Sequence, residues 1–249
     1  MIILKSAREI DIMRRANNIV AETHALLAEK LKPGISTAEL DEIAENFIRK
    51  NGAIPSFKGY RGFPAAVCIS INEEVVHGIP DNNRIINEGD IVSIDIGTIY
   101  EGFNGDAART HGVGKISEQA AKLIRVTGES LNKGISQAVV SNRLSDISNA
   151  VQTYAENRGY SVVREYVGHG IGREMHEDPQ IPNFGPPHRG PLLKSGMTLA
   201  IEPMINIGDY KVKTLADGWT VITKDGSLSA HIEDTIAITA KGPEILSRI

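Results

Sequence analysis

Two aspartates and two glutamates lie in apolar, strand-like segments of the sequence, where a charge needs a partner. Asp95 follows the apolar run IVSI, and Asp106 lies shortly after it in FNGDAART. Glu202 interrupts MTLAIEPMINI, and Glu233 interrupts SAHIEDTIAIT. An uncompensated buried charge costs several kcal/mol. These four acids are therefore candidates for holding a cation.

The two aspartates are predicted to share one face of a β-hairpin. IVSIDIGTIY alternates as a strand, Glu101–Gly102 mark a turn, and FNGDAART resumes extended structure. A hairpin centred between Tyr100 and Glu101 would place Asp95 directly opposite Asp106, with Cβ atoms ~5 Å apart. Two such carboxylates repel unless a cation or a shared proton lies between them. The pair alone leaves a second interpretation equally open, in which one aspartate is buried and the other is solvated at a bulge.

Two histidines stand in EYVGHGIGREMHED, residues 165–178. His169 has a glycine on each side, and glycine permits positive φ and close backbone approach. A metal, a substrate or a neighbouring strand could be what approaches, and this stretch alone does not decide among them. His176 follows seven positions later and precedes two acids.

Together the four carboxylates and His169 form a donor set without a thiolate. Such a set suits hard or borderline divalent ions such as Mn, Fe, Co or Zn. Four carboxylates exceed the needs of a single catalytic zinc ion and suit two metals ~3.5 Å apart that share bridging oxygens. The alternative is a 2-His-1-carboxylate iron site made from His169, His176 and one acid. It leaves the other carboxylates without a role.

The elements that must position these residues follow the same order twice. A pair of amphipathic helices precedes each group of strand-like segments, and KPGIS at 32–36 has an echo in NKGIS at 132–136. We therefore predict an α+β fold with two similar halves, residues 1–114 and 115–249. The predicted helices are those that begin with the capping boxes Ser6–Glu9 and Ser36–Glu39, and those over residues 117–133 and 144–159.

Composition narrows the class of protein. The 249 residues are 41% hydrophobic, enough for one sizeable core, and a net charge of −4 gives no basic footprint for nucleic acid. No apolar run approaches the ~18–20 residues of a membrane span, and the first residues become charged too early for a signal peptide. The one cysteine, Cys68, excludes an internal disulfide and fits a reducing compartment. We expect a cytoplasmic monomer that binds neither nucleic acid nor membranes.

Six short motifs stand in order along nearly the whole chain. They are VVHGIP at 75–80, DIG at 95–97, GDAA at 105–108, GHGIGREMHEDP at 168–179, AIEPM at 200–204 and IED at 232–234. In order and spacing they resemble the motifs of type I methionine aminopeptidases. The resemblance implies one catalytic domain over residues 1–249 with the pita-bread (creatinase/aminopeptidase) fold. In that fold, two pseudo-symmetric α/β halves with a curved, mainly antiparallel sheet surround a dinuclear metal site.

Carried across position by position, the resemblance implies two divalent ions, with Co, Mn, Fe and Zn as candidates. Asp106 and Glu233 would bridge them. The implied metal ligands are Asp95, Asp106, His169, Glu202 and Glu233. The implied reaction is the hydrolytic removal of the initiator methionine from nascent proteins and peptides, preferably before a small second residue. Transient association with the ribosome is an open expectation.

The resemblance also implies roles for residues around the metals. Glu202 would accept a proton, and His77 and His176 would contact the substrate and act in catalysis. The residues implied to line or border the methionine pocket are Tyr60, Phe63, Met175, Met204 and Trp219. Met175 stands where Phe or Leu is common in the family. Asp234 stands where relatives often carry His, and an extra acid there could alter metal preference or the pKa of the site.

Other residues and other classes of protein are predicted as follows. We expect His24 and His188 to be solvated and His111 to be structural, whereas His231 either supports the site or is a satisfied strand residue.

An Xaa-Pro peptidase of the same fold usually carries a large N-terminal domain, and only a few residues precede the first helix here. A type II methionine aminopeptidase needs an insertion that the 26 positions from His176 to Glu202 cannot hold. A non-catalytic binding protein of this fold would be expected to lack some of the five implied metal ligands, and all five are present in this sequence.

Overall fold

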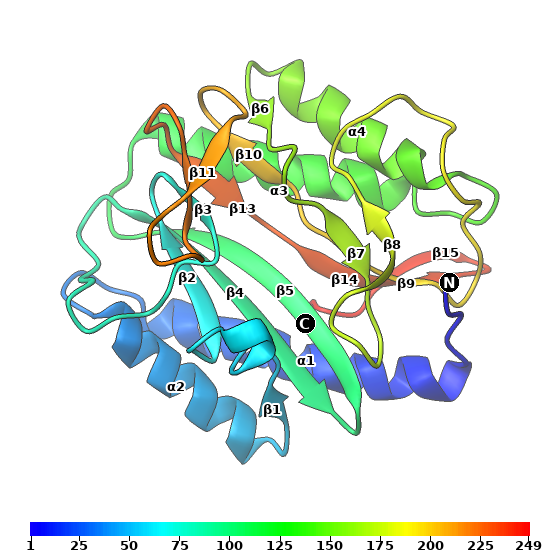
Figure 1. The fold of residues 1–249 in the computed structure, drawn as a ribbon, viewed down its shortest axis with the longest axis horizontal. Coiled ribbons are helices and arrows are strands. Elements are labelled where there is room, and N and C mark those ends of the chain that lie inside the picture. The colour runs from blue at the N-terminus through cyan, green and yellow to red at the C-terminus, as the bar shows by residue number, and fades with distance from the viewer.

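Helices form the two outer edges of the molecule, and the strands lie between them. The computed structural model describes residues 1–249. In Figure 1, α1 and α2 lie along one edge, and α3 and α4 lie along the opposite edge. The helices are α1 (Ala7–Lys30), α2 (Thr37–Lys50), α3 (Glu118–Ser136) and α4 (Leu144–Glu156), with a short 3-10 helix, η1 (Tyr60–Gly62).

Capping explains where three of the helices begin. The Ser6 side chain accepts from the backbone N–H of Glu9, and the Glu9 carboxylate accepts in return from the backbone N–H of Ser6. This confirms the predicted capping box of α1. The side chains of Ser36 and Ser117 cap α2 and α3 in the same way, although the reciprocal bond is absent there.

The two GIS segments differ in structure. KPGIS forms the loop between α1 and α2, whereas NKGIS lies in the last turns of α3. A Cβ at Gly134 would lie 2.7 Å from Cγ2 of Val151 on α4. Gly134 therefore allows α3 and α4 to pack closely, and the sequence echo does not mark equivalent loops.

All strand pairs are antiparallel, as predicted. The first half supplies β1 (Ile54–Pro55), β2 (Val67–Ile71), β3 (Glu74–Val76), β4 (Ile91–Tyr100) and β5 (Phe103–Gly112). The second half supplies β6 (Ser161–Val162), β7 (Gly168–Gly170), β8 (Glu177–Ile181), β9 (Thr198–Ile201), β10 (Met204–Asn206), β11 (Val212–Thr214), β12 (Val221–Thr223), β13 (Ser229–His231), β14 (Asp234–Thr239) and β15 (Gly242–Ile245).

Four sheets result, and one of them joins the halves. A four-stranded sheet holds β1, β4, β2 and β5, and a five-stranded sheet has the order β15-β14-β9-β7-β8. The three-stranded sheets are β13-β10-β6 and β11-β12-β3. Because β3 pairs with β12, a strand of the first half completes a sheet of the second.

The predicted strands are longer than those observed. The sequence predicts one strand over NRIINEGDIVSIDIGTIY, which begins at Asn83, but residues 83–90 contain no strand. The sequence likewise predicts a strand over SVVREYVGHGIG, but residues 161–172 form only the short strands β6 and β7. The apolar residues of these segments pack in the core without forming continuous ladders.

Each half has its own apolar core. The largest cluster consists of residues before 114, including Ile19 and Leu40 from the helices and Ile69 and Ile94 from the sheet. A second cluster joins α3 and α4 to β9 and β14 through residues after 130. A third packs Ile91 of β4 against α3 and β10, so the halves also share apolar contact.

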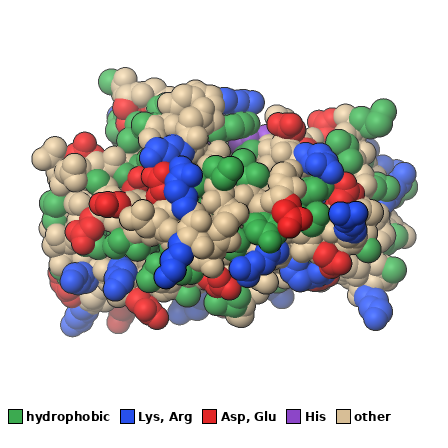
Figure 2. All heavy atoms as spheres, turned by 90° about the horizontal axis from the view of Figure 1, so that it is seen from below, with side chains coloured by type: hydrophobic (Ala, Val, Ile, Leu, Met, Phe, Trp, Pro, Cys, Tyr) green, Lys and Arg blue, Asp and Glu red, His purple; other side chains and the backbone are tan.

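The surface carries both signs of charge. On the face shown in Figure 2, Lys and Arg side chains are interspersed with Asp and Glu side chains, so this face has no field of one sign. No helix in the structure combines the length and apolarity that a membrane-spanning segment requires.

Candidate metal centre

The β4–β5 hairpin brings the two aspartates to one face, in a register that differs from the prediction. Asp95 lies opposite Ala108, and Asp106 lies opposite Gly97. The turn is Glu101–Gly102, with φ of 47° and 79°. The predicted pairing of Asp95 with Asp106 is therefore wrong by two residues. Because side chains alternate with a period of two, the shift keeps both carboxylates on the same face.

The two glutamates lie where strands are interrupted. Strand β9 ends just before Glu202, and β10 begins after Pro203, which has no N–H to donate. In the same way, β13 ends before Ile232, and β14 begins after Glu233. Strands β9 and β14 pair in one sheet, and β10 and β13 pair in another. The predicted continuous strands are thus wrong, and each glutamate occupies the point where the chain changes sheet.

His169 lies on β7 between two glycines that make room for other strands. A Cβ at Gly168 would lie 2.4 Å from the Ala200 carbonyl oxygen, and one at Gly170 would lie 2.1 Å from that of Asp178. Of the three explanations left open by the sequence, close strand packing is the one the structure supports. Nδ1 of His169 lies 3.0 Å from the Gly170 carbonyl oxygen, so it carries the ring proton and leaves a lone pair on Nε2.

These residues surround one cavity of about 160 Å³. Nε2 of His169 lies 3.5 Å from Oε1 of Glu202 and 3.8 Å from Oδ2 of Asp106. One donor atom from each of Asp106, His169 and Glu233 falls within a mutual distance of 4.8 Å. The cavity is lined by Phe57, Tyr60, Arg61, Phe63, Cys68, His77, Asp95, Asp106, His169, His176, Glu202, Trp219 and Glu233.

The carboxylates at this cavity lack compensating charge. Burial raises the pKa of Asp95 to about 7. Burial, followed by the neighbouring carboxylates, raises the pKa of Asp106, Glu202 and Glu233 well above the usual range. Oδ1 of Asp95, Oδ1 of Asp106 and Oε1 of Glu233 have no hydrogen-bond partner. Buried, unpaired oxygens of this kind fit divalent cations.

The imidazole beside them is held neutral, as a ligand must be. Burial, reinforced by His176, lowers the pKa of His169 to about 3. A neutral ring with a free Nε2 is the form that binds metal ions. The donor set of this cavity, four carboxylates and one neutral imidazole, therefore fits the divalent ions expected from the sequence.

Two further histidines line the cavity. The hydroxyl oxygen of Tyr60 lies 2.8 Å from Nδ1 of His176, whose ring lies 4.3 Å from that of His169, centroid to centroid. His77 has a positive φ of 61° and makes edge contacts with the rings of Tyr166 and Trp219. Burial lowers the pKa of both histidines, that of His77 to about 4, so both are neutral at neutral pH.

His231 and His24 lie behind the cavity. Nε2 of His231 is buried without a partner, 3.7 Å from Oε2 of Glu202 and 3.9 Å from Oε2 of Glu233. His24 was expected to be solvated, and this is wrong. It is buried where α1 packs on β5, with Nε2 2.9 Å from the Ala107 carbonyl oxygen. The signal was present, because His24 follows the apolar spacing of α1.

Three of the five expected pocket residues line the cavity, and two do not. Tyr60, Phe63 and Trp219 line the cavity, whereas Met175 and Met204 are buried in apolar clusters beside it. Sequence reasoning missed three lining residues, Phe57, Arg61 and Cys68. The spacing of the aromatic residues at positions 57, 60 and 63 could have indicated the first. Cys68 pairs with Asp95 across β2 and β4, a register that no local motif reveals.

Comparison with known proteins identifies the family. The profile of Metallopeptidase family M24 matches residues 11–240. The chain belongs to metallopeptidase family M24. Within this family, it is 63% identical over 249 residues to a methionine aminopeptidase from Clostridium perfringens, with 100% of both sequences covered. It is 60% identical over 247 residues to one from Clostridium acetobutylicum, with 99% of each covered. The resemblance to type I methionine aminopeptidases is thereby confirmed.

Solved M24 structures confirm the predicted pita-bread fold. A methionine aminopeptidase from Thermotoga maritima superimposes with a TM-score of 0.99 at 46% identity, and 100% of each chain is covered. A prolidase from Pyrococcus furiosus gives a TM-score of 0.80 at 25% identity, with 99% of this chain and 66% of the prolidase covered. The fold is therefore common to both M24 activities, and the choice between them depends on the site.

Proposed function

We propose that the protein is a methionine aminopeptidase that hydrolytically removes the initiator methionine from nascent proteins and peptides. The observation that carries this proposal is the convergence of four buried carboxylates and one neutral imidazole on a cavity walled by aromatic side chains. Curated relatives with this name match over the full length at 60% identity or more. The domain would span residues 1–249, with halves 1–114 and 115–249.

Two divalent ions would be held by Asp95, Asp106, His169, Glu202 and Glu233. The unpartnered oxygens of Asp95, Asp106 and Glu233 support the assignment of these residues as ligands. Co, Mn, Fe and Zn all suit this donor set. When bound, such ions lower the pKa of water and polarise a carbonyl group.

Glu202 would move the proton in this reaction. Its carboxylate lines the cavity beside His169, where it could accept a proton from a water molecule in the cavity. It would take a proton from the attacking water and deliver it to the leaving amine. His231, whose Nε2 lies 3.7 Å from the other oxygen, would stand beside the Glu202 carboxylate without a hydrogen bond to it.

The two cavity histidines would bind the scissile amide. The Tyr60 hydroxyl, by donating to Nδ1 of neutral His176, would keep the ring proton on Nε2. Nε2–H is then available to donate to the carbonyl oxygen as negative charge develops there. His77, fixed by edge contacts with Tyr166 and Trp219, would orient the amide from another side.

The apolar part of the cavity would receive the methionine side chain. Phe57, Tyr60, Phe63 and Trp219 supply aromatic surface, which makes favourable contacts with a thioether. Met175 and Met204 would border this pocket from the clusters behind it. The limited volume of the cavity supports a preference for a small second residue. We further propose that the protein acts as a cytoplasmic monomer on nascent chains, with transient association with the ribosome.

The proposal is tested by incubating metal-loaded protein with Met-Ala-Ser and with a peptide that begins Ala-Pro. Release of free methionine, abolished by a chelator, is the expected result. Cleavage only before proline would favour the prolidase activity seen elsewhere in the family. Stoichiometric metal uptake without turnover of any peptide would favour a binding protein.

A further inference from the structure

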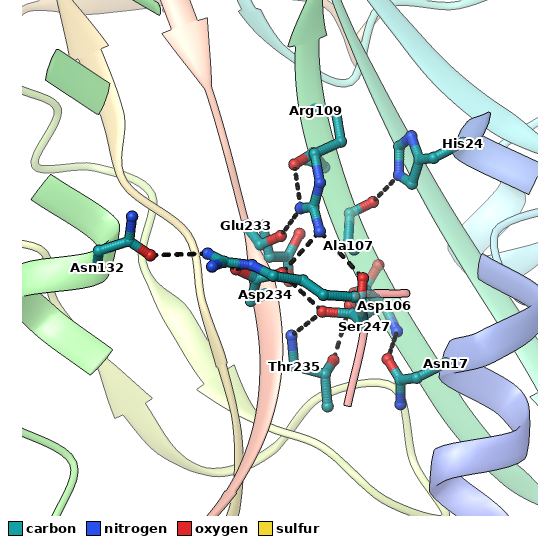
Figure 3. Close-up of polar contacts among 12 residues, drawn as sticks. Asn17, His24, Asp106, Ala107, Arg109, Asn132, Glu233, Asp234, Thr235 and Ser247 are labelled. Atoms are coloured by element: carbon teal, nitrogen blue, oxygen red, sulfur yellow. Dashed lines mark hydrogen bonds and ion pairs between the residues drawn. The ribbon is translucent and has the colours of Figure 1, made fainter. Parts of the chain in front are cut away.

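A second polar cluster lies on the side of β5 and of the β13–β14 junction that faces away from the cavity. Its centre is Arg109, three positions after Asp106 on β5 (Figure 3). One Arg109 nitrogen, Nη1, donates to the Ala108 carbonyl oxygen at 2.8 Å and to that of Glu233. The other, Nη2, donates to Oδ1 of Asp234 at 2.7 Å and to the Ser247 carbonyl oxygen at 3.0 Å. A single guanidinium therefore contacts β5, the β13–β14 junction and the C-terminal segment.

Asp234 belongs to this cluster and not to the cavity. Consecutive residues of extended chain point to opposite faces, so the Asp234 side chain faces backward where Glu233 faces forward. Its side chain is 0% exposed and pairs with both Arg109 and Arg248, whose Nε lies 2.9 Å from Oδ2. The Ser247 hydroxyl donates to Oδ1 at 2.8 Å. Asp234 therefore does not line the cavity, but its charge contributes to the raised pKa of Glu233, as the sequence led us to expect.

The same cluster fixes the backbone on both sides of the cavity-facing acids. The Thr235 hydroxyl donates to the carbonyl oxygen of Asp106 at 2.7 Å, and the Thr235 N–H donates to the Ser247 hydroxyl at 3.2 Å. The N–H of Glu233 donates to the Ala108 carbonyl oxygen at 2.9 Å. Asp106 on β5 and Glu233, just before β14, are 127 positions apart, and these bonds join the two segments directly at the site.

We propose that Arg109 is a positioning residue for the metal centre, held in place by Asp234 and the C-terminal Ser247–Arg248. It fixes the separation of the Asp106 and Glu233 carboxylates and so sets how well they share metal ions. The inference rests on the proposed function, which takes these two acids as ligands. The planar fork of arginine suits this task, because its donors contact several acceptors in one rigid geometry.

The test is the binding of Mn²⁺ to chelator-treated protein, measured by isothermal titration calorimetry. Arg109→Lys keeps the charge but replaces the fork with one ammonium group. We expect its affinity for Mn²⁺ to fall about tenfold or more. Metal affinity falls by a similar factor in other proteins when a group that supports a ligand is removed. Asp234→Asn should weaken binding in the same direction. The matched control is Arg158→Gln, since Arg158 is exposed and lies over the ring of Tyr154. Its affinity should equal that of the wild type.

Circular dichroism and thermal unfolding of the metal-free variants separate positioning from folding. A purely structural role would lower the melting temperature and leave the affinity of the folded protein unchanged. Should Arg109→Lys fail to fold, Ser247→Ala removes only one hydroxyl, and we expect an affinity loss of about fivefold. Wild-type affinity in the folded variants would overturn this inference alone. A wild-type protein that binds no Mn²⁺ would overturn the proposed function as well.

Discussion

The two faces of the strands around Asp106 and Glu233 hold acids of the same kind in opposite electrostatic surroundings. In front, four carboxylates and a neutral imidazole face one cavity, and three oxygens have no partner. Behind, Asp234 is equally buried but has two arginines and a serine hydroxyl. The structural carboxylate is thus fully paired by the chain, whereas the front carboxylates are not, which fits the proposal that they bind divalent ions. Whether a buried carboxylate has partners within the chain therefore distinguishes a structural acid from a candidate metal ligand more clearly than its burial does.

The largest expected effect is the loss of activity when a front acid loses its charge. Asp95→Asn keeps the size of the side chain but removes an anionic donor from the cavity. We expect methionine release from Met-Ala-Ser to fall to the level of the chelator-treated wild type. The initial rate at saturating Mn²⁺ measures this. Asp178→Asn, on the surface beside Met1, is the matched control, and the comparison fails if both variants behave alike.

In the metal-free protein, removing a carboxylate charge should change the free energy of unfolding in opposite directions on the two faces. Asp234→Asn leaves Arg109 and Arg248 without their carboxylate, so we expect it to lower the free energy of unfolding by about 2–3 kcal/mol, less than a fully buried pair would lose. Asp106→Asn relieves repulsion, so we expect it to raise that free energy by about 1 kcal/mol or more at pH 8. Urea unfolding in the presence of chelator measures both. Destabilisation of similar size in both variants would contradict the comparison.

The front acids should also make the metal-free protein sensitive to pH. Asp95 has its pKa raised from 3.8 to about 7 by burial, so the folded state holds a proton that the unfolded state has lost. The stability contribution of Asp95 is therefore highest below pH 4 and falls as the pH rises through about 7. We expect chelated protein to unfold at a lower urea concentration at pH 8 than at pH 5.5. Saturating Mn²⁺ should remove or reverse this trend, and an unchanged trend would count against metal binding by these groups.

The smallest expected effect concerns Tyr60, which touches the cavity without carrying charge. Tyr60→Phe removes the hydroxyl that contacts Nδ1 of His176. Losing one hydrogen bond of ~1 kcal/mol should lower kcat about fivefold, with little change in stability or Mn²⁺ affinity. The control is Tyr154→Phe, whose hydroxyl bonds Glu129 away from the cavity. Equal kcat values in both variants would show that Tyr60 does not orient the histidine.

The cavity-facing acids could be predicted from the local sequence, whereas the cluster of Arg109 and Asp234 behind them could not. Asp95, Asp106, Glu202 and Glu233 stood out because charges interrupt apolar strands, and the six motifs placed them in one family. The two-residue error in hairpin register did no harm, because a period of two preserves the face. The Arg109–Asp234 pair spans 125 positions and has no local pattern, so only tertiary packing reveals it.

The most direct test of the account is a crystal structure of the Mn²⁺-loaded protein with anomalous diffraction data at a wavelength where manganese scatters strongly. We predict two anomalous peaks in the cavity, within coordination distance of Asp95, Asp106, His169, Glu202 and Glu233, with Asp106 and Glu233 contacting both. Peaks elsewhere in the molecule, or a cavity without manganese at saturating concentration, would contradict it.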